Sequence, residues 1–106
     1  MGDARLTLSG VGSRTQKRHL EDIQRRLSAA RASLKILEEQ AVVWNDALDE
    51  ARIRSLVSET PLPAAEYSEM SKHVMAANTE LQRRSAEVRG LAAERDVLLR
   101  EWTPEG

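Results

Sequence analysis

The sequence contains no cysteine, no phenylalanine and only three aromatic residues, Trp44, Tyr67 and Trp102. The absence of cysteine excludes a disulfide framework, thiol catalysis and zinc sites with cysteine ligands. Apolar residues make up 41% of the chain. Because few of them are aromatic, and Ala, Leu, Glu and Arg dominate, the composition favours long helices or coiled coils over a mixed globular core.

Long apolar runs are also absent, and the first residues lack the apolar core of a signal peptide. We therefore expect a cytoplasmic protein that contacts no membrane. Only three lysines stand against thirteen arginines, a bias typical of GC-rich bacterial genomes, so we expect a bacterial source. The formal net charge is −1, which argues against general nucleic-acid binding by the whole chain.

Apolar side chains recur along residues 20–51 at steps that alternate between three and four. This is heptad spacing, typical of a helix that packs against another helix. Since no glycine or proline interrupts the region, the sequence predicts one helix over about 14–57, after a flexible N-terminal segment at 1–12. The seam of this helix comprises Leu20, Ile23, Leu27, Ala30, Leu34, Leu37, Ala41, Trp44, Leu48 and Ala51.

The prolines at 61 and 63 interrupt the pattern, because residues before proline avoid helical backbone angles. The sequence therefore predicts a loop over 58–63 and a second helix over about 64–102. The second helix has its own seam with the same alternating steps. Its members are Tyr67, Met70, Val74, Ala77, Leu81, Arg84, Val88, Leu91, Arg95, Leu98 and Trp102.

A short loop between two long helices predicts an antiparallel hairpin, so the predicted fold is an all-α, two-helix coiled-coil hairpin over residues 13–103. A turn near Leu62 places small residues opposite large ones, as in the pair of Trp44 and Ala77. Arg84 and Arg95 interrupt the apolar seam. Two interpretations stay open for them: their stems follow the seam while their guanidinium groups reach Glu38, Glu87 or Glu94, or they form a polar site that fixes the register.

Several apolar residues lie off both seams, where a two-helix hairpin cannot cover them. We expect this second stripe to be a partner surface, and a second copy that completes a four-helix bundle is the simplest partner. The charge distribution also favours self-association. Residues 14–35 carry seven basic and two acidic side chains, and residues 36–72 carry three basic and eight acidic ones. Two hairpins that pack antiparallel would therefore place oppositely charged ends together. The candidate partner surface comprises Ile36, Val43, Ile53, Leu56, Val57 and Leu99.

Motifs for catalysis are lacking, since no Ser/His/Asp pattern and no glycine-rich phosphate loop is present. Glu69 and His73 lie four residues apart, and the register places Asp46, Asp49 and Glu50 nearby. The Glu-x-x-His spacing of di-iron bundles is absent, so we expect no metal and no other cofactor. Basic residues between 14 and 31 spread around the helix without an aromatic residue among them, which argues against nucleic-acid binding there.

The sequence thus predicts a non-enzymatic helical protein–protein interaction module, a scaffold or adaptor that self-associates, with a dimer favoured. One alternative is a regulator that sequesters another protein, such as a transcription or secretion factor. A weak nucleic-acid binder that uses the basic end of the hairpin is a further alternative.

Overall fold

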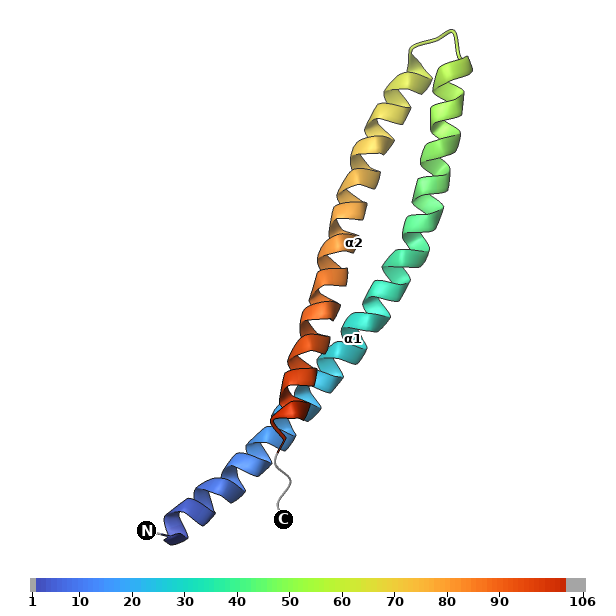
Figure 1. Ribbon diagram of the computed structural model, residues 1–106. Helices are drawn as coiled ribbons and strands as arrows, with labels where there is room; N and C mark the ends of the chain where they lie inside the picture. Colours follow the sequence, from blue (N-terminus) through green and yellow to red (C-terminus); the bar gives the residue numbers. More distant parts are fainter. Residues whose placement is uncertain (1, 103–106) are drawn as a thin grey trace. The chain divides into compact units, whose positions relative to one another are not determined.

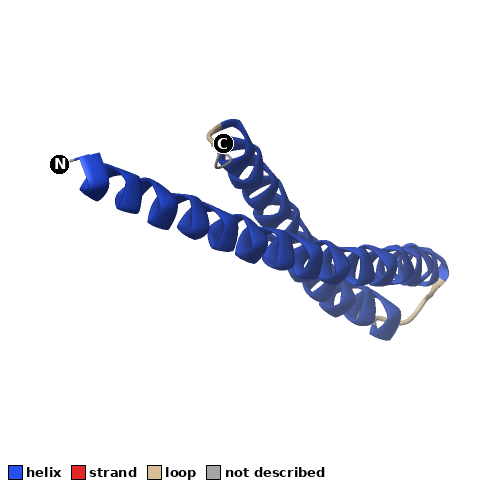
Figure 2. Cartoon of the chain, turned by 90° about the horizontal axis from the view of Figure 1, so that it is seen from below, coloured by secondary structure: helices blue, strands red, loops and turns tan. Residues whose placement is uncertain are grey.

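The computed structural model describes the backbone of residues 2–102 and the side chains of residues 14–102. This part of the chain contains two helices and no strand (Figures 1 and 2). Helix α1 spans Gly2–Val57 with 56 residues, and helix α2 spans Leu62–Arg100 with 39 residues. The structure confirms the all-α class and the two long helices that pack against each other as a hairpin.

Helix α1 begins at Gly2, well before the start that the sequence predicts near residue 14. No proline precedes residue 61, so nothing in the N-terminal segment forbids helical backbone, although each glycine there lowers helix propensity by about 1 kcal/mol. For residues 2–13 only the helical backbone is described, and Met1 lies outside the described residues. The flexibility that we expect for residues 1–12 stays a prediction.

The loop between the helices is shorter than predicted. The Ser58 N–H donates to the Arg54 carbonyl at 3.1 Å, where α1 ends, and the Thr60 N–H donates to the Ser58 hydroxyl at 3.1 Å. The Ala65 N–H donates to the Pro61 carbonyl at 3.1 Å, so α2 begins at Leu62 rather than near residue 64. Pro63 is compatible with this earlier start, because an N–H in the first helical turn has no partner within the helix.

The chain divides into two compact units, each of which contains a segment of both helices. The terminal unit comprises Met1–Arg31 and Glu87–Gly106, and the loop unit comprises Ala32–Ala86. In the terminal unit, Ile23 and Leu27 of α1 are completely buried and pack with the buried Leu91 of α2. Smaller or partly buried side chains surround this core: Ala30, Val88, Ala92 and Leu98. Burial of each large aliphatic side chain contributes about 1.5–3 kcal/mol.

The loop unit buries smaller side chains. Ala41, Ala51 and Val74 are its fully buried apolar residues. Leucines of both helices are only half-buried beside them: Leu34, Leu37, Leu48 and Leu81. The loop unit therefore lacks a completely buried large side chain such as Ile23 or Leu27 of the terminal unit.

Candidate interaction surface

The predicted seam residues lie on the faces along which α1 and α2 meet within each unit. All of them are buried or half-buried except Trp44, whose residue is 37% exposed. Arg84 and Arg95 are half-buried, like the apolar seam residues beside them. Heptad spacing therefore separates the inward positions from the outward ones.

The six residues of the candidate partner surface are all exposed, by 52% for Leu99 and up to 76% for Val57. Four further large apolar residues outside both seams are exposed: Val42, Leu62, Met75 and Val97. The sequence predicts Val42 and Met75 as part of the same off-seam stripe, the same spacing is the signal for Val97, and Leu62 falls in the predicted loop. All of these side chains face solvent in the single chain, so together they leave a large amount of apolar surface exposed to water.

Exposed apolar residues are distributed unevenly between the two units. Of the eleven large ones among the described residues, nine belong to the loop unit and two, Val97 and Leu99, to the terminal unit. Seven of the nine lie on α1, and all of these except the seam residue Trp44 lie on the side turned away from the seam at 3.6 residues per turn. We call these six the outer apolar surface: Ile36, Val42, Val43, Ile53, Leu56 and Val57.

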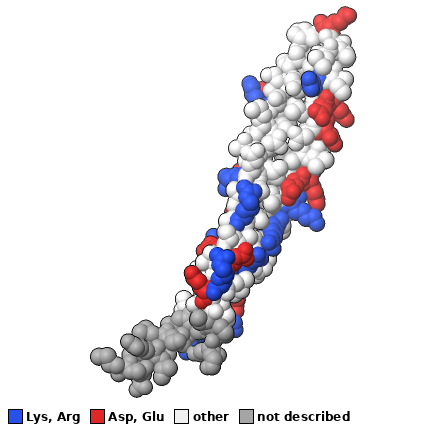
Figure 3. Space-filling model, in the orientation of Figure 1, with Lys and Arg blue, Asp and Glu red and all other residues white. Residues whose placement is uncertain are grey.

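Three exposed carboxylates, Asp46, Asp49 and Glu50, follow Val43 and precede Ile53 on α1. They divide the outer apolar surface into a group around Val43 and a group next to the loop. Figure 3 shows, on the face in view, that uncharged side chains cover much of the loop unit while acidic side chains gather along its α1 side. A partner for this surface therefore needs apolar side chains together with positive charge.

Hollows lie between α1 and α2 in both units, and the larger ones are a pocket and a groove. The loop unit has a pocket of about 330 Å³ beside Trp44, where the small side chains of Ala47 and Ala77 leave space. Its other lining residues are Met70, His73 and Val74. The terminal unit has a wider groove of about 520 Å³, which we call the terminal groove. It is lined by Leu20, Glu21, Gln24, Arg25, Arg95 and Leu99.

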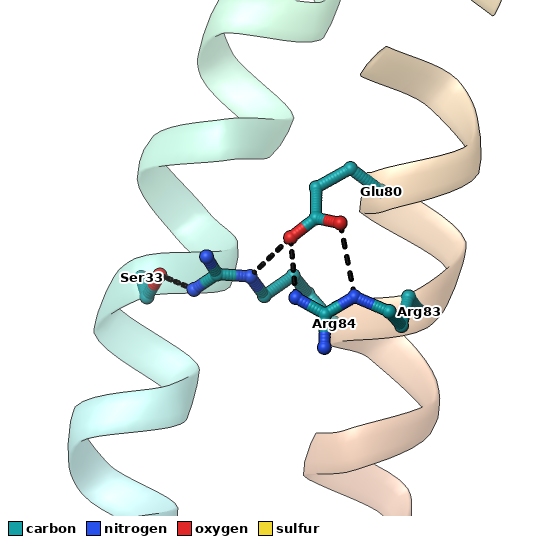
Figure 4. Close-up of polar contacts among 4 residues, drawn as sticks. All are labelled: Ser33, Glu80, Arg83 and Arg84. Carbon is teal, nitrogen blue, oxygen red and sulfur yellow. Dashed lines mark hydrogen bonds and ion pairs between the residues drawn. The ribbon is translucent and has the colours of Figure 1, made fainter. Parts of the chain in front are cut away.

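A polar cluster joins the two helices of the loop unit (Figure 4). The Arg84 Nη1 donates to the Ser33 hydroxyl of α1 at 2.6 Å, and the Arg84 Nε donates to the Glu80 carboxylate at 2.8 Å. The same carboxylate accepts two bonds from Arg83, at 2.6 and 2.9 Å. Hydrogen bonds from Arg83 and then Arg84 lower the pKa of Glu80 to about 2, because they stabilise the ionised form.

The partners of the seam arginines differ from those that the sequence suggested. Arg84 bonds to Glu80 and Ser33, and Arg95 bonds to Asp96 at 3.1 and 3.2 Å, in place of Glu38, Glu87 or Glu94. Glu80 precedes Arg84 by one helical turn, so the two side chains meet on one helix face without any constraint from the other helix. The bond to Ser33 is the contact that ties Arg84 to α1.

A second polar contact between the helices of the loop unit was missed by the sequence reasoning. Asn45 and Asn78 exchange amide hydrogen bonds at 3.4 and 3.5 Å, and Asn45 also donates to the Ala41 carbonyl at 2.7 Å. The signal was present, because the predicted antiparallel register pairs Trp44 with Ala77 and so makes Asn45 and Asn78 diagonal neighbours, within one helical turn of each other. The loop unit thus holds its two helices with polar as well as apolar contacts.

Metal-binding geometry is not found among the described residues, which contain no group of three His, Asp or Glu side chains suited to hold an ion. Glu69 pairs with His73 at 3.5 Å and with Lys72 at 3.8 Å, and all three side chains are exposed. In the described part of the chain, neither helix has a stretch long and apolar enough to cross a membrane.

Comparison with models of known protein families, with curated proteins and with solved structures finds no match for this chain. The features of the described chain that bear on function are the outer apolar surface of α1, the hollows between the helices and the polar cluster around Arg84.

Proposed function

We propose that the chain is a non-catalytic helical interaction module, a scaffold or adaptor that self-associates. Two copies pack through the outer apolar surface of α1 and complete a four-helix bundle. The observation that carries this proposal is the uneven exposure described above, with nine large apolar side chains exposed in the loop unit and two in the terminal unit.

The physical reason is the cost of leaving this surface in water. Each square ångström of apolar surface removed from water contributes about 25 cal/mol, and a hairpin has no third layer of its own to cover α1. In a four-helix bundle the outward positions of a hairpin become part of a shared core. Most soluble oligomers contain identical chains related by a two-fold axis, so a second copy is the partner that we propose.

Charge supports the same partner. The loop unit carries nine acidic and six basic residues, while the terminal unit carries ten basic and eight acidic residues. A second copy therefore offers positive charge to the acidic α1 side of the loop unit. Such complementarity accelerates association and selects the arrangement more than it raises affinity.

The test is the molar mass of the full chain by light scattering over a concentration series. We expect the wild type to hold a dimer mass on dilution to the low micromolar range. Val43→Glu places a charge in the outer apolar surface and should shift the protein to monomer. Met75→Glu is the matched control, because Met75 is 66% exposed against 64% for Val43 but lies on α2, outside this surface.

Thermal unfolding by circular dichroism checks that both variants stay helical. A wild-type monomer throughout the series would contradict self-association. It would favour the alternative function, a regulator whose exposed α1 surface sequesters a different protein such as a transcription or secretion factor.

A further inference from the structure

The end of the loop unit is the most exposed apolar part of the described chain. Leu56 and Val57 close α1 with exposures of 73% and 76%, and Leu62 opens α2 at 64%. Ile53, one turn earlier on α1, is also exposed, and we call these four residues the loop tip. Between residues 49 and 69 the chain carries five acidic and two basic side chains. The loop tip is therefore an apolar projection in an acidic surrounding.

The terminal groove combines apolar side chains with positive charge, and so complements the apolar and acidic loop tip. Leu20 and Leu99 supply apolar lining, and Arg25, Arg95 and Glu21 give the lining a net charge of +1. Arg95 already bonds to Asp96, so Arg25 is the positive group that is open to a partner. Leu99 is 52% exposed, so part of its apolar surface is open to a partner. The described side chains of the terminal unit include nine basic and six acidic residues. This groove therefore fits apolar side chains that carry carboxylates beside them.

We infer that the loop tip of one copy docks into the terminal groove of a second copy. This inference rests on the proposed self-association and names the two surfaces that meet. The apolar residues of the tip cover Leu20 and Leu99, while Glu59 in the loop approaches Arg25. Two copies related by a two-fold axis make this contact twice, because each copy contributes one tip and one groove.

Arg25 is available for such a contact. Its local partner is Asp22, at 3.5 Å, and the Arg25 side chain is 70% exposed. An exposed ion pair between residues three apart contributes little in water, so Arg25 can turn toward a partner carboxylate at small cost. Arg26 offers a matched control, because it pairs with the same Asp22 at 3.8 Å and is 59% exposed but does not line the groove.

The experiment is a charge exchange in the full chain, with dimer dissociation measured by sedimentation over a concentration series. Arg25→Glu and Glu59→Arg should each raise the dissociation constant of the dimer about tenfold, since each places like charges against each other. Arg26→Glu should leave it close to the wild-type value. The double variant Arg25→Glu/Glu59→Arg should restore dimerisation, because the two charges are then exchanged within the contact.

Mixing the two single variants sharpens the test. In the mixed dimer the unchanged Glu59 of one copy meets the unchanged Arg25 of the other, and the substituted Arg and Glu also meet. We therefore expect mixed dimers to dominate in native mass spectrometry of isotopically distinguished proteins. If the loop tips of the two copies contacted each other instead, Arg25→Glu would leave the dissociation constant of the dimer unchanged.

Two failures are distinguishable. A wild-type dimer in which Arg25→Glu behaves like Arg26→Glu, or in which the double variant is weaker than either single variant, would overturn the docking of tip into groove and leave the proposed function standing. A wild type that stays monomeric would overturn both. Circular dichroism of each variant verifies that the helices of the terminal unit remain folded.

Discussion

The terminal unit and the loop unit each pair a segment of α1 with a segment of α2, yet the side chains that they bury differ in size. In the terminal unit, Ile23 and Leu27 are completely buried against Leu91. In the loop unit, two of the three fully buried residues are alanines, Ala41 and Ala51. The loop unit also exposes most of the large apolar side chains, so its two helices leave more apolar surface uncovered than the helices of the terminal unit.

The two units also differ in the polar contacts between their helices. The loop unit joins α1 and α2 through Ser33 and Arg84 at 2.6 Å and through Asn45 and Asn78 at 3.4 and 3.5 Å. The terminal unit has an exposed pair at 3.5 Å between His19 and Glu94. Polar contacts at a helix seam add less stability than apolar packing but specify the register. From this comparison we expect the terminal unit to contribute more to stability than the loop unit does.

The largest expected effect is a loss of stability when the buried core of the terminal unit is altered. Leu27→Ala should lower the free energy of unfolding by about 2–5 kcal/mol, because it removes a completely buried side chain and leaves a cavity. Leu37→Ala is the matched substitution in the loop unit, on the same helix and seam, where the leucine is half-buried. Its effect should be clearly smaller, since solvent already reaches that side chain. Urea unfolding followed by circular dichroism measures both.

If Leu27→Ala and Leu37→Ala lowered the free energy of unfolding equally, the proposed difference in core packing between the two units would be wrong. Native-state hydrogen exchange would then show whether the loop unit has a tighter core than its exposure indicates.

A gain in stability is expected from Gly90→Ala in the terminal unit. A Cβ at Gly90 would meet no heavy atom within 4 Å, and the position is exposed within α2. Alanine should therefore stabilise the chain by about 0.5–1 kcal/mol, through a higher helix propensity and a less flexible unfolded state. Thermal unfolding measures the gain. The reverse substitution Ala93→Gly, at an exposed position less than one turn away, should cost a similar amount, and a loss with Gly90→Ala would mean that the glycine has a role in packing.

The heptad spacing of the apolar residues predicts most of what the structure shows of the fold. It separated the inward side chains from the exposed ones on both helices, including Val43 and Leu56 on the outer apolar surface. It did not reveal that one unit has a closed core and the other does not, because the seam steps are equally regular in both. Burial depends on the volume of the side chains that meet: alanines dominate the buried positions of the loop unit, while Ile23, Leu27 and Leu91 fill the terminal core.

Polar partners were less predictable than helical faces. The sequence suggests Glu38, Glu87 or Glu94 as partners of Arg84 and Arg95, but Glu80, one turn before Arg84, and Asp96, next to Arg95, take this role. A long arginine side chain has many acceptors within reach, and small differences in rotamer decide among them. The spacing of three and four residues between Glu80 and the two arginines was the signal that could have identified the cluster.

The smallest expected effect concerns Glu80, whose pKa falls from an ordinary value of 4.5 to about 2 through the hydrogen bonds of Arg83 and Arg84. Because the folded pKa lies below the unfolded one, the ionised carboxylate stabilises the fold above pH 4.5, and this contribution disappears as the pH falls toward 2. Glu80→Gln should therefore have a lower melting temperature than the wild type at pH 7, with the difference closing between pH 4.5 and 2.

The Glu80 side chain is 38% exposed, so solvent screens the interaction and the shift should stay small and shrink further in high salt. A difference between the two proteins that is independent of pH would show that the Glu80 charge adds nothing to stability. In that case the hydrogen bonds of Arg84 with Ser33 and of Asn45 with Asn78 would be the polar contacts that distinguish the loop unit from the terminal unit.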